Sequence, residues 1–123
     1  MSQKTILIVD DEKDIVEVVK KRIEFAGYNV KCAYDGKEAL FMIEQEAPDL
    51  IVLDIMMPEL NGSTLCGMLK FDGRFKDIPI VILSVMSRDL DKMIGEEVKA
   101  DAYLTKPFEA KELIDVIKKL LSD

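Results

Sequence analysis

Residues 49–62 read DLIVLDIMMPELNG, an apolar run that leads into one carboxylate, Asp54, and then into a loop of Met, Pro, Asn and Gly. A Val-, Ile- and Leu-rich run of this length, bounded by turn residues, is typical of a strand that is buried on both faces. Because Asp54 ends the run, we expect its side chain at the rim of the sheet. Asp is also a favoured helix N-cap, but Asn61 directly precedes the next expected helix and is a candidate for that role. We therefore expect another role for Asp54.

The rest of the chain alternates between strand-like and helix-like segments. The expected strands are 6–9, 28–34, 49–54, 78–84 and 102–105, and the expected helices are 13–26, 37–45, 63–71, 89–98 and 109–121. This alternation predicts an α/β domain with a parallel sheet, and right-handed crossovers place helices on both of its faces. No linker or internal repeat interrupts the pattern, so we expect a single domain over residues 1–123 with no output domain in this chain.

The composition excludes several classes of function. The 123 residues carry a formal net charge of −7, which argues against nonspecific binding to nucleic acid or to an anionic membrane. There is no His, which removes a histidine general base and most zinc and haem sites. No run of about eighteen apolar residues is present, and the polar start before the first expected strand is too short for a signal peptide. We therefore expect a cytoplasmic protein that binds neither nucleic acid nor membrane.

Polar residues stand at the carboxyl ends of four expected strands: Asp10 and Asp11, Asp54, Ser84, and Lys106. Ligands of open parallel sheets bind at this edge. Two carboxylates about 4 Å apart repel each other by on the order of 4 kcal/mol at an effective dielectric constant near 20. A bound hard cation removes that repulsion, and oxygen ligands without His favour Mg²⁺, with Mn²⁺ as a possible substitute. A cation, a lysine and a hydroxyl around a nucleophilic carboxylate are what phosphoryl transfer requires.

Each of these residues also has a plainer explanation. Asp10 and Asp11 could cap the helix that follows them, Lys106 could be a solvated surface lysine, and Ser84 could be an ordinary hydroxyl at the end of a strand. Only their joint occurrence at one rim favours a chemical site.

Taken together, the motifs resemble those of the receiver domains of two-component response regulators, in particular chemotaxis-type single-domain receivers. The resemblance covers essentially the whole chain and rests on IVDDE at 8–12, LDIMMPELNG at 53–62, ILS at 82–84 and ADAYLTKPF at 100–108. It implies a flavodoxin-like, doubly wound (βα)₅ fold with a five-stranded parallel sheet of order 2-1-3-4-5.

The resemblance also implies a metal site and a phosphoacceptor. Asp54 matches the residue that takes a phosphoryl group from a histidine kinase, a histidine phosphotransfer protein or a small acyl phosphate. Asp11 and Asp54 match direct Mg²⁺ ligands, Asp10 matches a ligand through water, and Met56 matches a ligand through its backbone carbonyl.

Further residues match the parts of a switch. Lys106 resembles the lysine that binds the phosphoryl group, and its bond to Pro107 is expected to be cis. Ser84 matches the hydroxyl that moves toward the phosphoryl group, and Tyr103 matches the aromatic side chain that rotates inward behind it. The resemblance implies that this change alters the surface of the fourth helix, fifth strand and fifth helix, where a downstream protein binds. We expect a monomer, or a weak dimer that depends on phosphorylation.

Two rival functions are compatible with this sequence. Phosphatases of the haloacid dehalogenase type need a second acid two residues after the nucleophile, and Met56 occupies that position, so we expect no enzyme activity beyond the chain's own phosphorylation and dephosphorylation. A degenerate receiver that acts as an unphosphorylated interaction module is the stronger rival. The presence of Asp11, Asp54 and Lys106 argues against it.

Overall fold

The computed structural model describes residues 3–55, 62–84 and 100–122, and every structural statement below refers to these residues. They form one parallel sheet of order β2-β1-β3-β4-β5. Its strands are β1 (Thr5–Val9), β2 (Asn29–Ala33), β3 (Leu50–Asp54), β4 (Ile80–Ser84) and β5 (Ala102–Thr105). This order confirms the flavodoxin-like fold that the resemblance implied.

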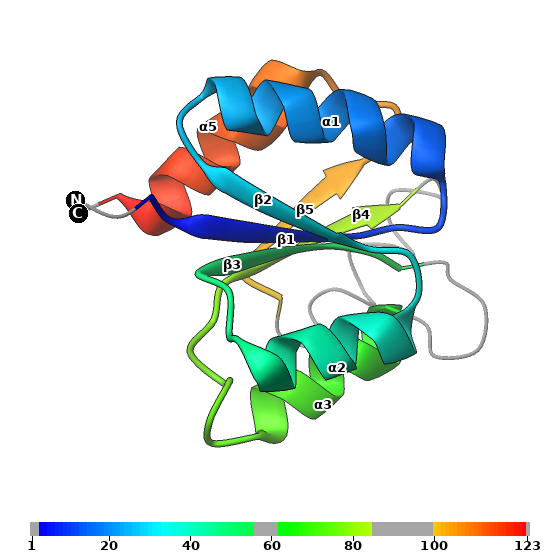
Figure 1. Ribbon diagram of the computed structural model, residues 1–123, viewed down its shortest axis with the longest axis vertical. Coiled ribbons are helices and arrows are strands. Elements are labelled where there is room, and N and C mark those ends of the chain that lie inside the picture. Colours follow the sequence, from blue (N-terminus) through cyan, green and yellow to red (C-terminus); the bar gives the residue numbers. More distant parts are fainter. Residues whose placement is uncertain (1–2, 56–61, 85–99, 123) are drawn as a thin grey trace.

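Helices cover both faces of the sheet. They are α1 (Lys13–Phe25), α2 (Gly36–Gln45), α3 (Gly62–Phe71) and α5 (Ala110–Leu121). In Figure 1, α1 and α5 lie on one face and α2 and α3 lie on the other, as right-handed crossovers require. The helix expected at 89–98 falls outside the described residues. Within the described part of the chain, no helix is both long and apolar enough to cross a membrane.

The sequence of the central strand β3 is apolar without alternation because both faces of this strand are buried. Successive strand side chains point to opposite faces, and all five residues of β3 are buried. Ile51 and Leu53 belong to the core under α2 and α3, whereas Leu50 and Val52 belong to the core under α1 and α5. Each such side chain contributes about 1.5–3 kcal/mol on burial. The two cores therefore hold β3, and with it Asp54, in a rigid position.

Local chemistry sets the ends of the first two helices. α1 ends before Gly27, whose φ of 106° is a conformation that glycine adopts readily. At the start of α2, the Asp35 carboxylate accepts a hydrogen bond from the Glu38 backbone N–H at 2.7 Å, and the Glu38 carboxylate accepts one from the Tyr34 backbone N–H at 2.8 Å. The helix therefore begins at Gly36, one residue before the expected start.

The strand expected at 78–84 is two residues shorter in the structure. It begins at Ile80 because Pro79 has no N–H to donate to a neighbouring strand. The Ile78 carbonyl instead accepts a hydrogen bond from Lys70 Nζ at 3.0 Å. Lys70 also donates to Asp101 Oδ2 at 2.7 Å, and the same oxygen accepts the Ile80 N–H at 2.8 Å. This network joins the end of α3 to the starts of β4 and β5.

Candidate functional site

Four polar side chains meet at the carboxyl edge of the sheet, as their places at strand ends predicted. Asp10 follows β1, Asp54 ends β3, Ser84 ends β4 and Lys106 follows β5. Within the described ranges, these four are the buried polar or charged residues, with exposed fractions of 1%, 4%, 0% and 9%. Buried charges are costly unless they are paired. A concentration of all of them at one edge therefore marks a site that serves more than stability.

The Lys106 amine lies at the centre of this site. Its Nζ donates hydrogen bonds to Asp10 Oδ2 at 2.8 Å and to Glu12 Oε1 at 3.0 Å. The distance from Nζ to Asp54 Oδ2 is 3.8 Å, which makes an ion pair but exceeds the usual hydrogen-bond range. Lys106 thus joins the ends of β1 and β3 to the segment that follows β5.

These contacts keep the lysine protonated. Burial by itself would lower the pKa of Lys106, but the hydrogen bonds to Asp10 and Glu12 and the charges of Asp10 and Asp54 outweigh it and raise that pKa above its ordinary value. The amine therefore carries a positive charge at neutral pH, in a position where a negative group bound to Asp54 would meet it.

Three carboxylates have the arrangement of a cation site. Oxygen atoms of Asp10, Glu12 and Asp54 lie within 4.8 Å of one another. One lysine cannot neutralise three carboxylates, and an all-oxygen donor set suits a hard divalent cation such as Mg²⁺. The residues therefore fit the metal ion that the resemblance implied.

The described carboxylate cluster does not include the other two expected ligands. Asp11 is exposed, and it is not among the three clustered carboxylates of the described residues. Met56 falls outside the described residues. The roles of both as ligands stay predictions.

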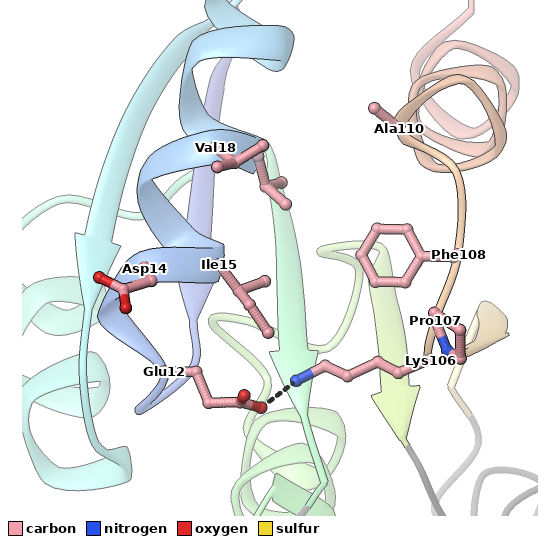
Figure 2. A pocket seen from close by; sticks show the side chains of 9 residues that line it. Glu12, Asp14, Ile15, Val18, Lys106, Pro107, Phe108 and Ala110 are labelled. Atoms are coloured by element: carbon pink, nitrogen blue, oxygen red, sulfur yellow. Dashed lines mark hydrogen bonds and ion pairs between the residues drawn. The ribbon is translucent and has the colours of Figure 1, made fainter.

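Glu12 belongs to the IVDDE motif at 8–12, but the sequence alone predicts no separate role for its side chain. Its backbone has the extended conformation of a helix N-cap, with φ −88° and ψ 90°, and its N–H donates to Asp10 Oδ1 at 3.0 Å. This turn places the Glu12 carboxylate beside Lys106 rather than along the outer face of α1 (Figure 2). The position of Glu12 directly after Asp10 and Asp11 hints at a place near the site. The direction of its side chain, however, depends on this cap geometry.

Ser84 and Tyr103 occupy neighbouring strands close to the site. The backbone carbonyl of the buried Ser84 accepts the Lys106 N–H at 2.6 Å, and the Lys106–Pro107 peptide bond is cis. The Tyr103 ring packs against the core under α2 and α3. Its hydroxyl is buried and has no hydrogen-bond partner among the described residues.

Gly62 permits a close backbone approach directly behind Asp54. The Gly62 N–H donates to the Ile55 carbonyl at 3.1 Å. A Cβ at position 62 would lie 2.8 Å from Ile55 Cα and would overlap the backbone oxygen of Asp54. Glycine is therefore required where α3 begins, a requirement that a sequence motif alone does not explain.

A cavity of about 590 Å³ opens beside the site, between the start of α1 and residues 106–110. Figure 2 shows Ile15 and Val18 on its α1 wall and Phe108 on the opposite wall. Glu12 and Lys106 face each other at one end. The ion pair between Glu12 and Lys106 therefore borders a cavity whose walls are largely apolar.

Known proteins share this sequence and architecture. The family model of the response regulator receiver domain matches residues 6–118. A protein from Chloroflexus aurantiacus assigned to the response regulators is 35% identical, with a TM-score of 0.94 over 99% of this chain and 100% of that one. The chemotaxis protein CheY4 of Vibrio cholerae is 30% identical, with a TM-score of 0.90 over 98% and 100% of the two chains. The receiver domain of Francisella response regulator 1452 is 38% identical, with a TM-score of 0.88 over 96% of each.

The sheet order, the acidic cluster around Lys106 and the family match over nearly the whole chain agree with one another. The chain therefore belongs to the response regulator receiver domain family of two-component signalling.

Proposed function

We propose that this receiver accepts a phosphoryl group on Asp54 in a reaction that depends on Mg²⁺, from a histidine kinase, a histidine phosphotransfer protein or a small acyl phosphate. The observation that carries the proposal is the buried Asp54 carboxylate, 3.8 Å from the Lys106 amine and within 4.8 Å of two further carboxylates. The carboxylate that would act as the nucleophile, a positive charge and carboxylates that would hold a cation therefore lie together at one edge of the sheet.

The transfer from acetyl phosphate balances without a proton. An Asp54 carboxylate oxygen attacks phosphorus, the bond from phosphorus to the acetate oxygen breaks, and acetate leaves with the electron pair. The dianionic phosphoryl group becomes an acyl phosphate on Asp54. Lys106 would neutralise part of the charge that the phosphoryl oxygens carry, and phosphoryl transfer depends mainly on such electrostatic stabilisation and on positioning.

Asp10, Glu12 and Asp54 would hold the metal ion, together with Asp11 and the Met56 carbonyl as the resemblance implies. When bound, the ion supplies positive charge to the phosphoryl oxygens. Mn²⁺ would serve in place of Mg²⁺, because both accept oxygen ligands.

Ser84 and Tyr103 would couple phosphorylation of Asp54 to a conformational change at the protein surface. The Ser84 hydroxyl would move to the phosphoryl group, and the Tyr103 ring would follow. The Tyr103 hydroxyl supports this role, because it is buried without a hydrogen-bond partner among the described residues. An unsatisfied buried hydroxyl costs about 1–3 kcal/mol, so a rearrangement that gives it a partner would be favourable. As the resemblance implies, the readout would be a surface made by β5, α5 and the helix expected at 89–98, where a downstream protein would bind.

The protein would act in the cytoplasm as a monomer or as a weak, phosphorylation-dependent dimer, and would catalyse only its own phosphorylation and dephosphorylation. We infer that neither nucleic acid nor membrane is a partner, because the net charge is −7. A degenerate receiver that works without phosphorylation is the alternative.

Incubation with Mg²⁺ and acetyl phosphate, followed by intact-mass measurement, separates the two. The proposal predicts a gain of one phosphoryl group that is absent in Asp54→Ala and absent when EDTA removes the cation. No gain in the wild-type protein would contradict the proposal and favour the interaction module.

A further inference from the structure

The Lys106 amine has three N–H groups, and two of them are committed to carboxylates that would not carry the phosphoryl group. They donate to Asp10 at 2.8 Å and to Glu12 at 3.0 Å, whereas Asp54 Oδ2 lies 3.8 Å away. Figure 2 shows the lysine extended across the end of the cavity to Glu12. The side chain expected to bind the phosphoryl group is therefore held by other partners.

Those two partners differ in how easily they release the lysine. The Asp10 side chain is 2% exposed, so separation from Lys106 would leave a buried, unpaired carboxylate. The Glu12 side chain is 50% exposed and can turn into water at little cost. Glu12 is thus the partner that gives up Lys106 when another anion competes for the amine.

We propose that Glu12 is a positioning residue that shares Lys106 with Asp10 and slows phosphorylation of Asp54 by withholding the amine from the incoming phosphoryl group. The proposal rests on the proposed function of Asp54 as a phosphoacceptor. Glu12 would thus slow the reaction through Lys106, in addition to its place among the carboxylates that would hold the cation.

The first turn of α1, which follows Glu12, offers a matched control. Asp14 lines the same cavity but makes no hydrogen bond or ion pair with Lys106. Asp14→Asn therefore removes one negative charge near the site without touching the lysine. Glu12→Gln removes one charge as well, keeps the side-chain size and weakens the contact with Lys106.

The experiment measures initial rates of phosphoryl incorporation from acetyl phosphate by intact mass, at Mg²⁺ concentrations where each variant has reached its plateau. This condition removes any effect of Glu12 on cation affinity. We expect Glu12→Gln to react about two- to fivefold faster than wild type, the ratio that a half-exposed ion pair supports. Asp14→Asn is expected to match wild type. In a Lys106→Ala background, Glu12→Gln is expected to add nothing, because its effect passes through the lysine.

Three outcomes would overturn the proposal: a Glu12→Gln rate equal to or below that of wild type, an equal gain in Asp14→Asn, or a gain that persists without Lys106. Each would leave the phosphoacceptor role of Asp54 intact, since the wild-type protein would still be labelled. Absence of label in wild type would contradict both proposals.

Discussion

The Lys106 amine donates a 2.8 Å hydrogen bond to the Asp10 carboxylate, and the side chains of this pair are only 7% and 2% exposed. The pair connects the first strand with the segment after the last one, so a contact between distant parts of the chain depends on two charges removed from water. A buried ion pair adds little to the free energy of unfolding compared with a pair of apolar side chains of similar size. Loss of one partner, however, leaves the other charge buried and unpaired, which is strongly destabilising.

Lys106→Met should therefore destabilise the fold as well as impair phosphorylation. We expect a loss of about 3 kcal/mol in the free energy of unfolding, measured by urea titration. The double variant Asp10→Asn, Lys106→Met should recover much of that loss because the uncompensated charge is gone. A single variant as stable as wild type would show that Asp10 does not depend on the lysine.

Divalent cations should stabilise the folded protein. Asp10, Glu12 and Asp54 converge within 4.8 Å, and binding to the folded state alone adds about 2.7 kcal/mol at a hundredfold excess over Kd. Relative to EDTA, saturating Mg²⁺ or Mn²⁺ should raise Tm by about 5–10 °C, with NaCl of equal ionic strength as the control for screening. Asp54→Asn should lose most of this shift. An equal Tm in EDTA and in Mg²⁺ would exclude the cation site.

Two glycines of α3 should respond to alanine in opposite directions. Gly62→Ala forces a Cβ into the backbone of Asp54 and Ile55 and should cost about 1–3 kcal/mol, with slower phosphorylation. Gly67 has open space around the Cβ position, so Gly67→Ala should gain about 0.5–1 kcal/mol. Chemical denaturation of both variants measures the difference, and a tolerated Gly62→Ala would refute the close approach behind Asp54.

Stability should fall in alkaline solution partly through Cys66. Burial raises the pKa of the Cys66 thiol from its ordinary value of 9.0 to about 11. Because the folded protein holds this proton more tightly than the unfolded chain, the contribution is complete below pH 9 and is lost as the pH rises toward 11. Each unit by which the pKa differs between the folded and unfolded protein corresponds to about 1.4 kcal/mol in the free energy of unfolding.

Unfolding free energies measured across this pH range should decline more steeply in wild type than in Cys66→Ala. Burial also raises the pKa of Cys32 and Tyr28, so the difference between the two proteins isolates Cys66. Parallel curves would contradict the assignment.

Much of this site could be predicted from local sequence. The run before Asp54 predicts a strand buried on both faces, and parallel strands bring Asp10, Ser84 and Lys106 to the same edge. The order of the strands could not be obtained in this way, because hydrophobic periodicity says nothing about which strands are neighbours. It came from the resemblance of motifs to a known family.

Other features depend on three-dimensional geometry that no local pattern encodes. Glu12 joins the site because its backbone turns the carboxylate toward Lys106, and Gly62 is required because α3 begins against the backbone of Asp54. The start of β4 at Ile80 follows from the missing N–H of Pro79 and from Asp101, which lies beyond that strand in sequence.

Asp54 itself is the residue that should carry the phosphoryl group. Borohydride reduces an acyl phosphate of aspartate to homoserine, so the protein can be treated with Mg²⁺ and acetyl phosphate, reduced, digested and mapped by tandem mass spectrometry. We expect homoserine at position 54, and only when Mg²⁺ is present. Homoserine at Asp10 or Asp11 instead, or at no position, would contradict it.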